Sequence, residues 1–378
     1  LAFDPSNTTQ DEIYAACASD MIVRSTNGGN SWTTVLGAFA SSSRYTDVAV
    51  TSTGQVYATF GNHTGSATTK GIFTSNSGDT GSFSNITPPA LSGTYRRIEI
   101  AVAPSNEDVV YFIAETPSAG TNGHMLFKYQ LSTNTWTDLS SNIPSYGAFS
   151  NGVFDSQGSY DLLIKVNPAN ENQIYIGGTS LYRLTFAPPA TTATASVQIG
   201  GYSNSGDNWN GTTGNIDQHA DQHALTFRPG SSTIAVSGHD GGISFTNDIT
   251  AGTVTWDNQN NGYLTTQFYT AAVDQNTAND NVLVGGLQDN GSWWVNSSSS
   301  SANWAEQLGG DGSFTAISNN KGYYYFSWQN GTIYRFRLNS AGALLGFRRV
   351  DPTGGTGYQF INPFILDPTN TARMYLAG

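Results

Sequence analysis

Short apolar stretches with polar residues at alternate positions run through the whole chain, and helical periodicity is nearly absent. Ile98, Ile100 and Val102, for example, are apolar at every second position, which is the pattern of a β-strand with one buried face. Each stretch ends at a turn rich in Pro, Asn or Gly, and a second apolar stretch follows. This pattern predicts an all-β chain built from short strands.

The strand–turn–strand unit recurs along the chain with variations. The copies lie at residues 1–7, 48–50, 100–106, 164–170, 225–229, 271–273, 315–317 and 364–370. Aligned on the position of the Pro, successive copies are about 44 to about 64 residues apart, which is the range of a four-stranded propeller blade with its loops. We therefore predict a β-propeller with seven complete repeats and a truncated eighth. Seven blades are favoured, and eight or more remain an alternative.

The repeats assign residues 1–358 to one propeller, and residues 359–378 to the incomplete start of a further repeat or of a second propeller. The sequence opens at Leu1 inside an apparent strand, with neither an initiator Met nor a signal peptide. We interpret it as a processed or excised part of a longer polypeptide.

The amino-acid composition excludes several classes of protein. Only 11% of residues are charged, while 42 are Gly and the aromatic residues are 8 Trp, 19 Tyr and 19 Phe. This excludes a helix bundle and disfavours disorder. The net charge of −12 comes without a basic stripe, so we expect no nucleic-acid partner. No run of about 18 apolar residues exists, so no membrane insertion is expected. The single Cys17 cannot form an internal disulfide.

One turn carries a motif of its own. Residues 25–32 follow the pattern Ser-x-Asp/Asn-x-Gly-x-Ser/Thr-Trp. In such a turn the Asn27 side chain binds backbone N–H groups, Gly29 adopts positive φ, and Trp32 packs against the blade. We assign Ser25, Asn27, Gly29 and Trp32 a structural role. The motif is the Asp-box, or BNR repeat, of sialidases and related propellers, and looser versions lie at residues 75–83 and 246–256.

Nearly the whole chain resembles the secreted BNR/Asp-box propellers of bacteria, which are similar in repeat style to xyloglucanases and sortilin-type propellers. The segments that carry the resemblance are residues 221–225, 238–242, 285–291 and 309–312. The resemblance implies a secreted or cell-surface bacterial protein, whose partners are polysaccharide or cell-surface glycan and further modules of the same polypeptide.

The resemblance leaves enzyme activity open. A sialidase is expected to carry an Arg-Ile-Pro motif, which this chain lacks, so sialidase activity is not expected. Xyloglucanase-type enzymes are expected to use one Asp from each of two propellers, and one propeller is visible. If the chain is an enzyme, it is a glycoside hydrolase.

Unusual polar residues fall on one predicted face of blades five to seven. In a four-stranded blade, the loop between the second and third strands and the loop that enters the next blade emerge on the same side. Asp217, His219, Asp221 and His223 alternate along the segment that enters blade five. In an extended strand all four side chains would share a face, and imidazoles with carboxylates suit a divalent metal. A hydrogen-bonded structural network is the alternative. No cofactor is otherwise implied.

Three aspartates beside glycines are the catalytic candidates: Asp240, Asp289 and Asp311. Two such carboxylates could act as acid and base on a glycosidic bond. They could equally accept N–H groups of their own tight turns.

A substrate-binding role is predicted for polar and aromatic residues next to these aspartates. Sugar rings stack on aromatic faces, and amides bind their hydroxyl groups. The candidates are His239, Gln288, Asn290, Tyr269 and Trp328. We therefore expect a module that recognises an extracellular polysaccharide, with hydrolysis of that polysaccharide left open. The alternative is a non-enzymatic scaffold or adhesin module of a larger secreted or surface protein.

Overall fold

The computed structural model describes residues 1–40, 45–63, 67–117, 120–121, 123–146, 153–202, 218–262, 267–274 and 276–378. They form two compact units, Leu1–Gln259 and Asn260–Gly378. Both units consist of four-stranded antiparallel sheets in which consecutive strands pair, which confirms the all-β prediction. Within the ranges just given, no helix is long and apolar enough to cross a membrane.

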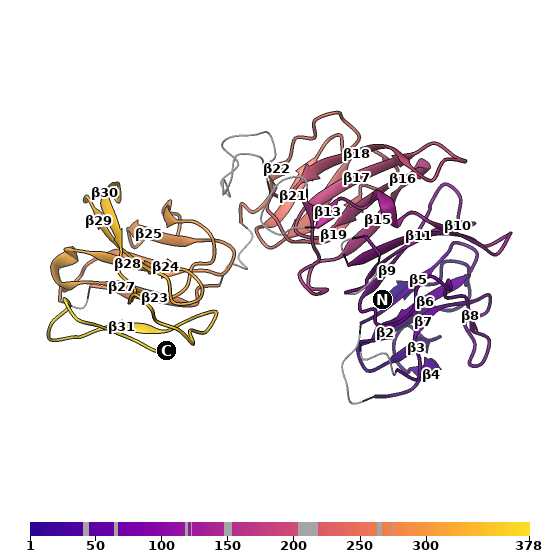
Figure 1. The fold of residues 1–378 in the computed structure, drawn as a ribbon, viewed down its shortest axis with the longest axis horizontal. Helices are drawn as coiled ribbons and strands as arrows, with labels where there is room; N and C mark the ends of the chain where they lie inside the picture. Colours follow the sequence, from indigo (N-terminus) through magenta and orange to yellow (C-terminus); the bar gives the residue numbers. More distant parts are fainter. Residues whose placement is uncertain are drawn as a thin grey trace. The chain divides into compact units, whose positions relative to one another are not determined.

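Unit 1, Leu1–Gln259, holds five four-stranded sheets, which we call blades one to five (Figure 1). A short parallel pair and one 3-10 helix lie in sequence between blades three and four. The elements are β1 (Ala2–Phe3), β2 (Ile13–Cys17), β3 (Met21–Ser25), β4 (Thr33–Gly37); β5 (Thr46–Val50), β6 (Val56–Phe60), β7 (Gly71–Ser75), β8 (Ser84–Asn85); β9 (Ile98–Val102), β10 (Val109–Glu115), β11 (His124–Gln130), β12 (Thr135–Asp138); η1 (Ser140–Asn142), β13 (Ser145–Tyr146), β14 (Val153–Phe154); β15 (Leu163–Asn167), β16 (Asn170–Gly177), β17 (Leu181–Phe186), β18 (Ala193–Gly200); β19 (Gln222–Phe227), β20 (Ala235–His239), β21 (Gly242–Thr246) and β22 (Asp257–Asn258).

Unit 2, Asn260–Gly378, holds blades six and seven and a two-stranded hairpin. The seven four-stranded repeats are thus confirmed, and a two-stranded sheet follows them. The predicted domain boundary between residues 358 and 359 stays a prediction. The elements are β23 (Thr270–Val273), β24 (Val282–Gly286), β25 (Ser292–Asn296), β26 (Ala305–Leu308); β27 (Thr315–Ile317), η2 (Asn319–Lys321), β28 (Tyr324–Ser327), β29 (Ile333–Leu338), β30 (Leu344–Arg349); β31 (Phe364–Leu366) and β32 (Met374–Leu376).

Successive blades are neighbours through their first strands. In unit 1, β5 contacts β9, β9 contacts β15, and β15 contacts β19; in unit 2, β23 contacts β27. The apolar cores therefore lie between blades. Tyr14 and Ile22 of blade one pack with Val56 and Phe60 of blade two. The same arrangement recurs at each following pair of blades within a unit.

The Asp-box turn joins β3 to β4. The Ser25 hydroxyl accepts the N–H groups of Asn27 (3.3 Å) and Gly29 (2.9 Å), and Asn27 Oδ1 accepts that of Ser31 (2.9 Å). Gly29 adopts φ of +88°. Trp32 differs from expectation: it is 41% exposed and donates to the Gly29 carbonyl oxygen at 3.0 Å. Its ring covers its own turn because that bond holds the indole there.

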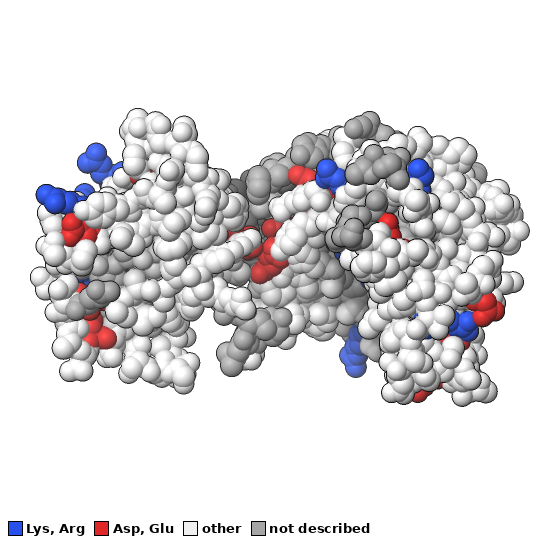
Figure 2. Space-filling model, turned by 90° about the horizontal axis from the view of Figure 1, so that it is seen from below, with Lys and Arg blue, Asp and Glu red and all other residues white. Residues whose placement is uncertain are grey.

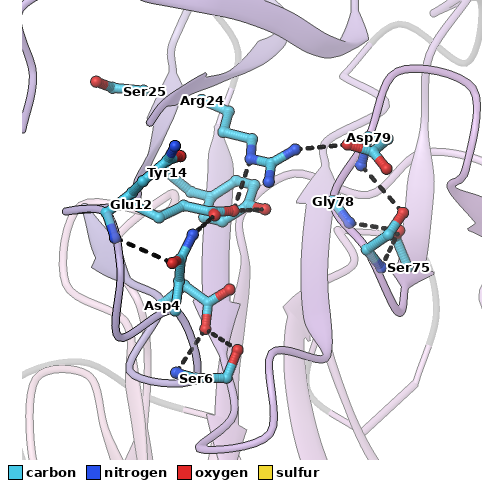
Figure 3. A network of polar contacts seen from close by, with 12 residues as sticks. Asp4, Ser6, Glu12, Tyr14, Arg24, Ser25, Ser75, Gly78 and Asp79 are labelled. Atoms are coloured by element: carbon cyan, nitrogen blue, oxygen red, sulfur yellow. Dashed lines mark hydrogen bonds and ion pairs between the residues drawn. The ribbon is translucent and has the colours of Figure 1, made fainter. Parts of the chain in front are cut away.

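A polar network links the edges of blades one and two (Figure 3). Arg24 lies 2.6 Å from the buried Glu12 carboxylate and 2.7 Å from Asp79, which follows β7. The Tyr14 hydroxyl donates to Glu12 at 2.6 Å. Burial opposes ionisation of Glu12, but its contacts with Arg24, Tyr14 and Asn7 outweigh burial and hold its pKa below the usual 4.5. Gly78 lies against Tyr14: a Cβ at Gly78 would stand 1.7 Å from the Tyr14 hydroxyl oxygen.

We predict that Gly78→Ala destabilises the protein far more than Gly81→Ala. Both glycines have positive φ, +64° and +82°, so both variants incur a backbone cost of about 1 kcal/mol. Only the Gly78 variant also clashes with a neighbour, since nothing lies within 4 Å of a Cβ at Gly81. Overpacking adds about 1–3 kcal/mol. Urea unfolding of the two variants measures the difference, and equal losses would contradict this account of blade packing.

A second prediction concerns pH. Because the folded state lowers the pKa of Glu12, its ion pair stabilises the fold above the unfolded pKa of about 4.5 and ceases to do so as pH falls through the lower, folded value. The difference in unfolding free energy between wild type and Glu12→Gln should be largest above about pH 5 and shrink below pH 4.5. Urea unfolding from pH 3 to 7 tests this, and a difference independent of pH would refute it.

Candidate functional sites

In unit 1 a ladder of backbone hydrogen bonds gathers loops of blades four and five. The Thr179 N–H, between β16 and β17, donates to the Asp155 carbonyl at 2.7 Å. The Asp221 N–H, just before β19, donates to the Thr179 carbonyl at 3.2 Å, and the Asp240 N–H, just after β20, donates to the Asp221 carbonyl at 3.2 Å. The loop of residues 155–161 joins the same group, because Gln157 Nε2 donates to Asp221 Oδ1 at 3.1 Å.

The outer part of this group is a triad of Tyr160, His223 and Asp240. His223 Nε2 lies 2.5 Å from Asp240 Oδ1, and the Tyr160 hydroxyl donates to Asp240 at 3.2 Å. Tyr160 is 50% exposed and meets the His223 ring edge-on. Burial opposes ionisation of Asp240, but the hydrogen bond and charge of His223 outweigh it and lower the Asp240 pKa. Asp240 is therefore an ionised carboxylate beside an exposed aromatic ring.

His239, predicted to bind substrate, lies inside the blade. It is buried, its Nε2 pairs with Ser244 Oγ at 2.8 Å, and its ring stacks on that of His219 with centroids 5.9 Å apart. Burial and the neighbouring His219 lower the His239 pKa to about 3. The ring is thus neutral at pH 7 and is enclosed within blade five, directly before Asp240 in the sequence.

The predicted metal-binding segment is not one extended strand. β19 begins only at Gln222, Asp221 adopts φ of +63°, and the pairing of β19 shifts register between Gln222 and Ala224. The alternation along this segment therefore does not place its side chains on one face. Instead His219 stacks on a histidine, Asp221 accepts from Gln157, and His223 pairs with Asp240. Asp217 lies outside the described residues.

Sequence reasoning missed Asp161, which lies in the same group. Its side chain is fully buried, and neither carboxylate oxygen has a hydrogen-bond partner among the described residues. Burial and the charges of Asp221, Asp155 and Asp240 raise its pKa to about 9. The loop of residues 155–161 belongs to no repeat, so the repeat pattern that located the other candidates could not point to it.

In unit 2 the two remaining catalytic candidates meet. Asp289, in the turn between β24 and β25, adopts φ of +58° and donates its N–H to Asp311 Oδ1 at 3.1 Å. The two loops are also joined through backbone, since Gly291 N–H donates to Gly310 O and Gly312 N–H donates to Leu287 O, both at 2.8 Å. Asp311 thus accepts an N–H group of the turn between β24 and β25, not one of its own loop.

The substrate-binding residues predicted in unit 2 contact the loops that carry Asp289 and Asp311. Tyr269 is 44% exposed, and its hydroxyl donates to Gln288 Oε1. Burial and the charges of Asp289 and Asp311 raise the Tyr269 pKa. Asn290 Nδ2 donates to the Gln288 carbonyl at 3.1 Å, and Trp328 Nε1 donates to the carbonyl of Gly309, two residues before Asp311. The unit therefore brings an exposed aromatic ring, amides and carboxylates together.

Comparisons with known proteins show similarity to solved structures only. No family model matches the chain, and no curated protein matches it. The GH74 xyloglucanase from Xanthomonas campestris is 14% identical, with a TM-score of 0.50 over 96% of this chain and 59% of that one. A GH74 enzyme from Niastella koreensis is 18% identical (TM-score 0.48; 99% and 59% covered), and YCF48 from Cyanidioschyzon merolae is 12% identical (0.40; 86% and 91%).

At such identities the likeness concerns the fold alone. The four-stranded sheets and the match to the xyloglucanase structure make this chain a β-propeller. It spans about three fifths of the length of the two GH74 enzymes.

We predict that Asp311→Ala destabilises the protein by about 1 kcal/mol, because it removes the acceptor of the Asp289 N–H. Asp311→Asn keeps a carbonyl oxygen at that position and should change stability little. Chemical unfolding of both variants measures the two effects. Equal stability of the alanine and asparagine variants would show that the turn does not depend on this bond.

Proposed function

We propose that this β-propeller binds polysaccharide through the loop residues around Tyr269. The observation that carries the proposal is an exposed tyrosine whose hydroxyl binds Gln288, the residue before Asp289, whose N–H in turn binds Asp311. Sugar rings stack on such faces, while amide and carboxylate groups bind their hydroxyls.

Surface charge supports a neutral polysaccharide as the ligand. Only 11% of residues are charged, and on the face drawn in Figure 2 charged side chains are few and scattered over a mostly uncharged surface. The Tyr160 triad of unit 1 offers a second exposed aromatic ring beside a carboxylate. The fold likeness to a xyloglucanase supplies the first probes, which are xyloglucan and other β-glucans.

We expect Tyr269→Ala to weaken binding to the responsive polysaccharide about tenfold, since a stacked aromatic contact contributes roughly 1–1.5 kcal/mol. Affinity electrophoresis in polysaccharide gels and calorimetry measure this. The matched control is Tyr375→Ala, which removes a tyrosine that is 55% exposed and bound to Asp367 at 3.2 Å in the same unit. Equal effects of the two variants, or no retardation of wild type by any polysaccharide, would contradict the proposal.

Hydrolysis and export remain predictions. Reducing-sugar release by wild type, abolished in the double variant Asp289→Asn with Asp311→Asn, would identify a hydrolase. Binding without turnover would identify a recognition module, and absence of both would favour the scaffold or adhesin role.

A further inference from the structure

Asp161 is a buried carboxyl group that no described part of the protein binds. Its side chain has no exposed surface, and within the described part of the chain both carboxylate oxygens lack a hydrogen-bond donor. Its backbone N–H is satisfied by the Ser156 carbonyl at 3.3 Å, which fixes the position of the residue. A buried carboxylate is normally paired, hydrogen-bonded or bound to a metal, so this one points to a missing positive group.

Thr179 presents a second unsatisfied oxygen in the same group of loops. Its side chain is fully buried, and Oγ1 has no hydrogen-bond partner among the described residues. The backbone ladder holds Thr179 between Asp155, which accepts its N–H, and Asp221, which donates to its carbonyl. The Thr179 hydroxyl and the Asp161 carboxylate are thus two buried groups of the same loops whose oxygens have no hydrogen-bond partner among the described residues.

Asp161 lies among other carboxylates, and two arginines contact or approach its loop. Asp221 is buried, and its charge, with those of Asp155 and Asp240, is felt at Asp161. Arg96 pairs with Glu115 at 3.0 Å. Arg97 pairs with Glu99 at 2.7 Å and donates to the carbonyls of Ser159 and Tyr160 at 3.2 and 3.0 Å. Neither arginine donates a hydrogen bond to Asp161. Among the described residues, no hydrogen bond compensates the charge that Asp161 would carry when ionised.

We propose that Asp161, Thr179 and Asp221 bind a Ca²⁺ ion within unit 1. The two carboxylates supply the charge that a divalent cation balances, and the hydroxyl completes a set of oxygen donors. The site ties the loop of residues 155–161 to the turn after β16 and to the start of β19, so the bound ion stabilises the loops that carry Tyr160 and Asp240.

The donor chemistry selects Ca²⁺ among the common cations. All three side chains offer oxygen, which suits hard cations rather than Zn²⁺. The nearest imidazoles have other partners, since His223 pairs with Asp240 and His239 Nε2 pairs with Ser244. Mg²⁺ usually keeps several waters, whereas the Asp161 and Thr179 side chains are fully buried.

The rival explanation is a proton. Asp161 could stay protonated and share its proton with a neighbouring carboxylate, in which case no metal is needed. The two explanations differ for Asp161→Asn, because asparagine resembles a protonated aspartic acid but is a poor partner for Ca²⁺. They differ again for Thr179→Val, which removes only the hydroxyl.

The test uses the full chain, stripped with EDTA and returned to metal-free buffer at pH 7. We expect about one Ca²⁺ per chain by calorimetry, and a melting temperature that rises with CaCl₂ but not with NaCl at equal ionic strength. Asp161→Asn and Thr179→Val should each weaken Ca²⁺ binding by at least about tenfold, since even outer-shell partners of a metal contribute that much. The control is Asp248→Asn, an exposed turn aspartate of unit 1, which should bind Ca²⁺ as wild type does.

Several results would overturn the proposal: no bound Ca²⁺, tighter binding of Mg²⁺ than of Ca²⁺, or unchanged Ca²⁺ affinity in Thr179→Val. An Asp161→Asn variant that matches or exceeds wild-type stability, with no response of either protein to Ca²⁺, would establish the shared proton instead. Should Asp161→Asn fail to fold, Thr179→Val decides, because an unpartnered buried hydroxyl can be removed at little cost to the metal-free fold.

Discussion

Packing between blades is the interaction on which the rest of the structure depends. A four-stranded sheet of this size cannot enclose a core by itself, so its apolar faces are buried only against neighbouring sheets. The core clusters accordingly join consecutive blades, as Tyr57 and Ile72 of blade two join Phe112 and Phe127 of blade three. This is why the chain is rich in aromatic residues and poor in charge, and why its loops are free to vary.

The loops carry the polar chemistry because packing leaves them out of the core. Their positions are nevertheless defined, since backbone hydrogen bonds run from loop to loop in each unit: Thr179 and Asp221 are held this way in unit 1, and Gly291 and Gly312 in unit 2. A side chain on such a loop is preorganised by the loop backbone as well as by its own contacts. That arrangement suits recognition of an extended, mostly neutral ligand, in which several modest contacts act together.

The repeat pattern predicted the strands, the blades and the turns correctly because strand alternation and turn residues are local properties. It also located the turns that bear Asp240, Asp289 and Asp311. The pattern did not predict the backbone conformation of single residues. The left-handed conformation of Asp221 interrupts the alternation of side chains that was expected along the segment from Asp217 to His223. The pattern also missed Asp161, because burial of a loop aspartate depends on what packs over it, which no local pattern records.

The contact between Gly78 and Tyr14 has a consequence for how such chains diverge. The tyrosine fills the space that a side chain at position 78 would need, although the two residues lie in different blades and far apart in sequence. Positions 14 and 78 can therefore change only together. Homologues with a small residue at position 14 should tolerate Asn or Asp at position 78, which suit positive φ. Those that keep the tyrosine should keep the glycine.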